Sequence, residues 1–356
     1  MQNSDTSNDI STELQQQVEH AFNHKQALKI VGAGNKSFLG LTTEGELLST
    51  QNHTGVISYE PSELVITARA GTALKTIEDL LQANGQYLPF EPPHYGATAT
   101  LGGCIASGLS GPAHPWAGGV RDYMLGCKII NGKGEILTFG GQVMKNVAGY
   151  DLSRLMVGSM GTLGVLLEVS IKVLPLPEKV ITLSSSITFK NAQKTWLDWY
   201  RQPLPLSAIT WLDGQQFIRL AGDSIAVDNT AKTMPADIDT SATNLWQNLR
   251  EQTHDFFQKN NKDLWRLSVP QNAPCLEPKN TLIEWGGGVR WTHGEQQQAH
   301  QQAADLSGHA TLHKTASTNV DIFQPLTAPL KKLNQRVKQA LDPAGIFNPG
   351  RMYRDY

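Results

Sequence analysis

The feature that most constrains the fold is a set of three glycine-rich loops in the first half of the chain. They lie at residues 32–40, 96–111 and 158–164. Glycine lacks a β-carbon, so the backbone of such a loop can approach a ligand closely, and its consecutive N–H groups can surround an anion. Three loops of this kind between positions 32 and 164 predict a site for a large, elongated, phosphate-bearing cofactor.

The first loop lies within the stretch IVGAGNKSFLG at residues 30–40, and this stretch matches neither of the two familiar phosphate-binding loops. A P-loop has glycine directly before its Lys-Ser pair, and here Asn35 takes that place. A dinucleotide fingerprint requires a third glycine close behind the second, whereas Phe38 and Leu39 intervene before the next glycine, Gly40. The loop is therefore either an ordinary turn or part of a third kind of site.

The composition is that of a soluble globular protein. Of the 356 residues, 40% are hydrophobic and 17% charged, and 30 basic residues against 32 acidic ones give a net charge of -2. This balance argues against a nucleic-acid-binding surface. Three widely spaced cysteines, Cys104, Cys127 and Cys275, form neither a disulfide framework nor a zinc site. With no signal peptide and no bilayer-spanning run, we expect a cytoplasmic protein.

The pattern of elements predicts an α+β protein with two domains. Residues 125–139 read as a β-hairpin, and residues 12–25 and 326–341 read as helices. A Pro-x-Pro sequence at 175–177 marks a domain boundary, after which tryptophans become frequent. We expect a first domain over residues 1–178 with a polar tail at 1–12, a second over 179–322 with an antiparallel sheet, and a C-terminal helix and tail over 323–356 that returns to the first domain.

Three segments carry a resemblance to a known superfamily. PPHYGATATLGGCIASGLSGPAHPWAGGVRDYMLG, KNVAGYDLSRLMVGSMGTLGV and the terminal DPAGIFNPGRM resemble the PCMH-type FAD-binding domain of vanillyl-alcohol-oxidase-type flavoproteins. Within that superfamily, residues 27–352 are similar to the FAD-binding subunits of bacterial glycolate oxidases. The resemblance implies two α/β subdomains that enclose FAD, and a ferredoxin-like cap domain.

The resemblance also implies a set of FAD-binding residues. The first loop matches the family's pyrophosphate loop through Gly32, Ala33, Gly34, Asn35, Lys36 and Ser37. The second flavin segment is matched by Thr98, Leu101, Gly102, Gly103, Ala106 and Ser107, with Pro92 beside the flavin ring. Main-chain bonds to the cofactor are implied for Gly161, Thr162, Gly164 and Val165.

The way in which FAD is held follows from two positions. Some members of the superfamily tether the flavin through a histidine in the first loop, where this chain has Asn35, or through a cysteine in the second region. Cys104 is interpreted as a small core residue. We therefore expect non-covalent FAD.

The sequence offers fewer candidates for substrate-binding residues than for FAD-binding residues. Oxidation of a 2-hydroxy acid requires a cation for the carboxylate, and an arginine offers two parallel donors for it. Arg290 and Arg351 are the candidates, against the alternative that each is a structural residue. Related D-lactate and glycolate dehydrogenases carry clustered histidines, whereas here His293, His309 and His313 are scattered. His309 and His313 are expected on one strand, about 13 Å apart, and no metal site is predicted.

Three functions remain open. The chain is an FAD subunit that works with a paralogous catalytic FAD subunit and an iron–sulfur subunit of glycolate oxidase, oxidising glycolate or D-lactate and passing electrons to a respiratory acceptor. Alternatively it is a free-standing FAD oxidase of a hydroxy acid or sugar, or a non-catalytic assembly subunit. The resemblance favours the first, with contact to the inner face of the cell membrane only through the complex.

Overall fold

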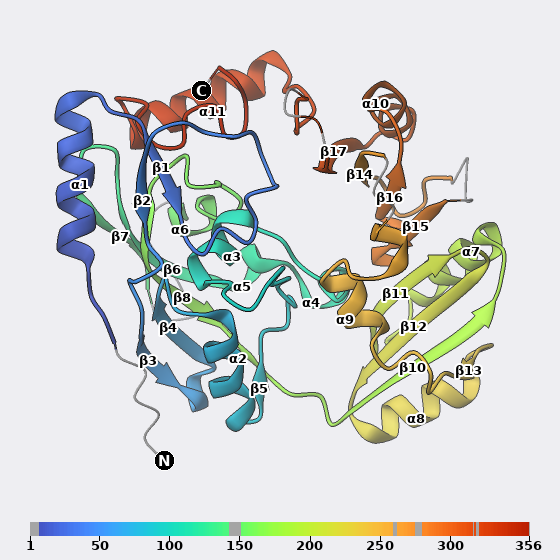
Figure 1. The fold of residues 1–356 in the computed structure, drawn as a ribbon. Helices are drawn as coiled ribbons and strands as arrows, with labels where there is room; N and C mark the ends of the chain where they lie inside the picture. The colour runs from blue at the N-terminus through green and yellow to red at the C-terminus, as the bar shows by residue number, and fades with distance from the viewer. Residues whose placement is uncertain are drawn as a thin grey trace. The chain divides into compact units, whose positions relative to one another are not determined.

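The computed structural model describes residues 7–141, 151–258, 262–274, 280–315, 317 and 320–355. Contacts between residues divide the chain into two compact units, drawn in Figure 1. Unit 1 comprises Met1–Leu109, Gly119–Pro175 and Pro325–Tyr356, and unit 2 comprises Ser110–Gly118 and Leu176–Gln324. The sequence placed the boundaries at 178 and 322, and it did not anticipate that Ser110–Gly118 would belong to the second unit.

Unit 1 is built on a five-stranded antiparallel sheet with the order β3-β4-β8-β6-β7 (Figure 1). Its strands are β3 (Val56–Glu60), β4 (Val65–Arg69), β6 (Met124–Ile130), β7 (Ile136–Gly140) and β8 (Val165–Lys172). A parallel pair, β1 (Leu28–Val31) with β2 (Glu46–Ser49), and a short antiparallel pair, β5 (Gln86–Tyr87) with β9 (Leu174–Pro175), complete its strands in the described part of the chain. Its helices are α1 (Ser11–His24), α2 (Leu74–Ala83), α3 (Leu101–Ser107), α5 (Val120–Tyr123), α6 (Leu152–Leu155) and α11 (Ala328–Leu341), with a 3-10 turn, η1 (Pro61–Glu63).

The inner strands β4 and β8 of this sheet are buried on both faces, since successive side chains of a strand point to opposite sides. On β8, Val165 and Leu167 join a core with α1 and β1, whereas Leu166 belongs to a core with α2 and α3. Strand β8 therefore reads as a nearly continuous apolar run rather than as an alternating one. Unit 1 therefore contains two apolar cores that share strand β8.

Local signals account for the elements that the sequence predicted in unit 1. Leu74, Ile77 and Leu81 recur at helical spacing and form the buried face of α2. The hairpin of β6 and β7 turns at Asn131, whose Oδ1 accepts hydrogen bonds from the N–H groups of Lys133 and Glu135. The predictions of a hairpin over 125–139 and of helices near both ends of the chain are confirmed.

Unit 2 contains an eight-stranded sheet made of two halves (Figure 1). The first half follows the chain as β10 (Lys179–Ser186), α7 (Phe189–Trp199), β11 (Leu206–Leu212), β12 (Gln215–Gly222), α8 (Ser224–Thr233) and β13 (Asp237–Ile238). In space its strands lie in the order β13-β10-β12-β11, which is the ferredoxin-like order. The predicted ferredoxin-like α+β fold is confirmed.

The second half repeats this strand order. It consists of β14 (Leu264–Ser268), β15 (Thr281–Glu284), β16 (Val289–His293), α10 (Gln296–Asp305) and β17 (His309–Lys314), in the spatial order β15-β16-β14-β17. The halves join where Trp211 of β11 pairs with Ile283 of β15. Shorter elements of unit 2 are α4 (His114–Ala117), α9 (Leu245–Arg250), η2 (Asp255–Gln258) and η3 (Trp285–Gly287).

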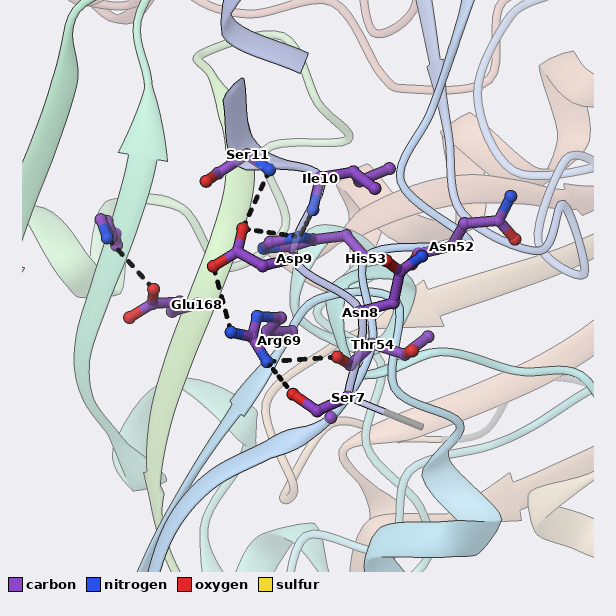
Figure 2. Close-up of polar contacts among 12 residues, drawn as sticks. Ser7, Asn8, Asp9, Ile10, Ser11, Asn52, His53, Thr54, Arg69 and Glu168 are labelled. Carbon is purple, nitrogen blue, oxygen red and sulfur yellow. Dashed lines mark hydrogen bonds and ion pairs between the residues drawn. The ribbon is translucent and has the colours of Figure 1, made fainter. Parts of the chain in front are cut away.

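The start of the described chain is tied to unit 1 rather than left as a free tail (Figure 2). Asn8 pairs with Thr54 through backbone hydrogen bonds in both directions. Asp9 forms an ion pair of 3.0 Å with Arg69, and the N–H of Ile10 donates to Nδ1 of the buried His53 at 3.2 Å (Figure 2). Burial lowers the pKa of His53, so its ring stays neutral and able to accept this bond.

Among the described residues, no helix combines the length and the apolar character needed to cross a membrane.

Candidate functional site

The three glycine-rich loops meet at one pocket in unit 1. The pocket encloses about 1010 Å³ of space, a figure that includes the part open to solvent. Twelve of the predicted FAD-binding residues line it: Gly32, Ala33, Gly34, Asn35, Lys36, Ser37, Gly102, Gly103, Ala106, Ser107, Gly161 and Gly164. Residues separated by more than a hundred positions in the sequence thus border the same space.

The first loop presents its backbone to the pocket. Gly34 has a φ of +77°, and a β-carbon added there would meet only Val31 Cγ1, at 3.9 Å. The second loop turns into α3, where the hydroxyl of Thr100 accepts a hydrogen bond from the N–H of Gly103 and caps the helix. A backbone exposed at glycine is what a bulky phosphate group needs for close approach.

The third loop also contains a buried serine hydroxyl that was not among the predicted site groups. Ser159 lines the pocket and is only 6% exposed, and its Oγ has no hydrogen-bond partner within the described parts of the chain. A buried hydroxyl without a partner costs about 1–3 kcal/mol, so a ligand acceptor at this point would relieve a cost already present. The glycine backbone and this donor together fit a phosphate-bearing cofactor. The only sequence signal was its place within the loop GSMGTLG.

Five predicted FAD-binding residues do not line the pocket. Leu101 and Val165 are fully buried in the two hydrophobic cores. Thr98 is exposed and its hydroxyl donates to Asn35 Oδ1, whereas Pro92 is buried outside the pocket. The carbonyl of Thr162 accepts a hydrogen bond from Lys338. Each has packing or hydrogen bonds in unit 1 that account for its place.

The two cysteines that the structure describes are unsuited to a flavin linkage. Cys104 and Cys127 are 1% and 4% exposed, and neither lines the pocket. Burial raises the pKa of both thiols to about 12, so the nucleophilic thiolate is scarce at neutral pH. This agrees with non-covalent FAD, which stays a prediction; Cys275 lies outside the described residues.

Arg351, predicted as a carboxylate clamp, lies in unit 1 beside the first glycine loop. Its Nη1 donates to Leu41 O at 2.7 Å and its Nη2 to Ser37 O at 3.2 Å. The residue also lines the pocket, and burial lowers the pKa of its guanidinium. This geometry favours a role in holding the loop over the predicted role in binding a substrate.

Arg290, the other predicted clamp, is buried in unit 2. It is 3% exposed, and its two Nη atoms donate to the carbonyl oxygens of Ala273 and Pro274. Its guanidinium lies 5.6 Å from the ring centre of Phe189 on α7. Because both Nη atoms are engaged within the fold, the geometry favours a structural role for this arginine.

A different arginine in unit 2, Arg266, is less buried than Arg290. Arg266 on β14 is partly exposed, and its Nη1 donates to Ser268 Oγ at 2.8 Å. Its guanidinium carbon lies 4.7 Å from the ring centre of Trp285 and 5.9 Å from that of Trp291. Stacking on aromatic rings orients a planar guanidinium. An isolated arginine on a strand carries no local signal, so the sequence alone does not single out Arg266.

The histidines of unit 2 do not gather. His309 and His313 lie on strand β17, which confirms the prediction of a strand. His313 is 2% exposed, and burial lowers its pKa well below the usual value. The described residues contain no group of three His, Cys, Asp or Glu side chains suited to a metal ion.

Comparison with known proteins agrees with this geometry. A family model described as an FAD binding domain matches residues 11–140. The glycolate oxidase subunit GlcE of Escherichia coli (strain K12) is 47% identical over 350 residues, covering 98% of each chain. The chain belongs to the GlcE family of glycolate oxidase subunits. The predicted family, the FAD cofactor and the assignment to FAD-dependent oxidoreductases are confirmed.

More distant relatives match part of the chain. The glycolate oxidase subunit GlcD of Bacillus subtilis (strain 168) is 34% identical over 40% of this chain and 30% of its own length. A D-lactate dehydrogenase of Archaeoglobus fulgidus is 34% identical over 47% of this chain and 37% of its own length. A solved alkyldihydroxyacetonephosphate synthase superposes with a TM-score of 0.65 at 16% identity, covering 95% of this chain and 74% of that one. The last comparison shows the shared fold.

Proposed function

We propose that this chain is the FAD-binding subunit of a complex that oxidises glycolate and related 2-hydroxy acids, and that it holds FAD non-covalently in the pocket of unit 1. The observation that carries the proposal is the convergence of three glycine loops, the third with the buried Ser159, on one pocket. The family of the chain, whose E. coli member is named as a glycolate oxidase subunit, supports the same conclusion.

The residues of unit 1 bind and orient the cofactor. The backbone of residues 32–36 would face the phosphates of the cofactor, and Ser159 would donate a hydrogen bond to it. When bound, FAD supplies the acceptor for a hydride from the carbon that bears the substrate hydroxyl. The glycines allow contact through the main chain, so no charged side chain needs to be buried against the diphosphate.

The proposed substrate contact is Arg266 rather than Arg290. A guanidinium binds a carboxylate through two parallel N–H donors, and it can do so only where those donors are accessible. Arg266 is partly exposed and oriented by Trp285 and Trp291, whereas Arg290 has both Nη atoms on backbone carbonyls. Arg266 would bind the carboxylate that distinguishes a 2-hydroxy acid from a simple alcohol.

The proposed partners are a paralogous catalytic FAD subunit and an iron–sulfur subunit, which together pass electrons to a respiratory acceptor. A second named glycolate oxidase subunit, GlcD, is among the relatives of this chain. Both FAD subunits of such a complex would then descend from one FAD-binding fold.

The experiment uses the full chain, first alone and then with its partners. The apoprotein is titrated with FAD, and the loaded chain is mixed anaerobically with glycolate while the flavin absorbance is followed. Bleaching only with the partners present supports the complex, whereas bleaching by the chain alone would identify a free-standing oxidase. No bleaching in either case would point to an assembly subunit. Acid precipitation should release the yellow colour into solution, and colour retained in the pellet would contradict non-covalent binding.

A further inference from the structure

A buried asparagine near the C-terminus joins the first and third glycine loops. Asn348 is 3% exposed, and its Oδ1 accepts a hydrogen bond from the N–H of Ile30 at 2.8 Å. Its Nδ2 donates to the carbonyl of Met160 at 2.7 Å. Ile30 lies two residues before the first loop, and Met160 lies within the third. One side chain thus bonds the backbones at both loops.

The contact is close on the side of the third loop. A β-carbon added at Gly161 would lie 2.6 Å from Nδ2 of Asn348, so the third loop can meet the asparagine amide only with glycine at this position. The backbone N–H of Asn348 also donates to Leu28 O at 3.0 Å, which fixes the residue against β1. Asn348 itself has a φ of +40°, a conformation that asparagine tolerates better than most residues.

A buried ion pair holds the segment that carries Asn348. Nζ of Lys338 donates to Asp342 Oδ2 at 2.7 Å, and to the carbonyls of Thr162 and Phe347 at 2.8 Å each. Asp342 in turn accepts hydrogen bonds from the N–H groups of Ile346 and Phe347. All three ammonium donors are used, and one of them reaches the third glycine loop. The tail is therefore anchored directly before the asparagine.

A second anchor follows the asparagine. The backbone carbonyl of Arg351 accepts a hydrogen bond from Leu41 N at 2.8 Å, and its guanidinium donates to Ser37 and Leu41. Ser37 belongs to the proposed pyrophosphate loop. The C-terminal tail is thus bonded to the first loop through Arg351, and through Asn348 to Ile30, two residues before that loop.

We infer that Asn348 is a positioning residue for FAD: it sets the spacing between the first and third glycine loops, and through them the position of the cofactor. This inference rests on the proposed FAD site. The contact pairs are separated by 318 and 188 positions in the sequence, so these hydrogen bonds join segments that are distant along the chain. A single amide that bonds both loops makes the pocket complete before the cofactor arrives, which is how preorganisation raises affinity.

The test compares two variants of the full chain with a matched control. Asn348→Gly deletes both side-chain hydrogen bonds and tolerates the positive φ, and Asn348→Asp keeps an acceptor for Ile30 N but loses the donor to Met160 O. The control is Thr67→Val, which deletes a buried hydrogen bond to Ser170 in the same unit but away from the pocket. Each apoprotein is unfolded with urea and titrated with FAD by flavin fluorescence.

Both Asn348 variants should bind FAD at least tenfold more weakly than wild type, and Asn348→Gly should have the lower affinity of the two. Both should also change the visible circular dichroism of the bound flavin. Thr67→Val should lose stability while binding FAD as wild type does. Binding by both Asn348 variants within twofold of the control would overturn the inference and leave the proposed FAD site standing. Failure of the wild-type chain to bind FAD would instead refute the proposed site itself.

Discussion

Replacing Ser159 with alanine should change stability and cofactor affinity in opposite directions. In the apoprotein the hydroxyl is buried and has no partner among the described residues. Its removal takes away an uncompensated polar group and leaves the backbone bonds of the loop intact, including those that Ser159 O accepts from Thr162. We expect the free energy of unfolding of the apoprotein to stay level or to rise by up to about 2 kcal/mol.

FAD affinity should fall in the same variant. If the hydroxyl donates to the cofactor, its loss removes one hydrogen bond worth about 1 kcal/mol, which corresponds to roughly a fivefold higher Kd. Ser153 provides the matched control, because its side chain is also buried, at 2% exposure, but its hydroxyl already donates to Asp151 at 2.8 Å and lies off the pocket. Ser153→Ala should lose about 1 kcal/mol of stability and keep the wild-type Kd.

Urea unfolding of each apoprotein and fluorescence titration with FAD measure the two quantities separately. The reasoning is refuted if Ser159→Ala destabilises the apoprotein as much as Ser153→Ala does and binds FAD with an unchanged Kd. Such a result would mean that the hydroxyl serves the fold and does not face the cofactor.

Three further predictions address other parts of the chain. Lys338→Met should cost about 3–5 kcal/mol of unfolding free energy, because it leaves Asp342 buried without its cation, and the double variant with Asp342→Asn should recover part of that loss in urea unfolding. Arg266→Lys should raise KM for glycolate in the assembled enzyme about tenfold, with a smaller effect on kcat, because a lysine cannot offer two parallel donors. Arg290→Lys should instead lower the melting temperature. Equal effects of the two variants on KM would contradict the assignment of Arg266 to the substrate. Burial lowers the pKa of His53 below its usual 6.5, so this histidine is protonated in the unfolded chain before it is protonated in the folded one. The free energy of unfolding should therefore fall as the pH drops below about 6.5, by up to about 1.4 kcal/mol per pH unit for this group. His53→Gln should show a shallower loss in urea titrations between pH 7 and 5, and an unchanged slope would rule out this histidine as the source.

Much of unit 1 could be predicted because its signals are local. The apolar spacing of Leu74, Ile77 and Leu81 produces a helix wherever it occurs, and the turn at Asn131 closes a hairpin between neighbouring strands. The glycine loops likewise indicate a backbone that a ligand can approach closely. The resemblance to a family implied that these loops share one cofactor site, and the structure places residues of all three around one pocket.

The functional side chains of unit 2 could not be chosen from the sequence. Arg266 and Arg290 lie on adjacent strands, and Leu267 pairs with Arg290, so the register of β14 and β16 places the two arginines on opposite faces of the sheet. One guanidinium then meets backbone carbonyls in the interior, and the other meets the faces of Trp285 and Trp291. That difference depends on strand pairing, which no motif around either arginine encodes.

The amino-acid sequence by itself determined the residue chemistry of this protein: glycines where a cofactor backbone contact is needed, apolar spacing for the helices and strands, and the family motifs that imply FAD. The tertiary structure alone decided which polar groups are used. It brings Asn348 between Ile30 and Met160, and it buries the Ser159 hydroxyl beside the pocket without a hydrogen-bond partner among the described residues. The physical reason is that hydrogen bonds between residues hundreds of positions apart form only when the folded sheets and cores hold both partners in place, and no short stretch of sequence records that condition.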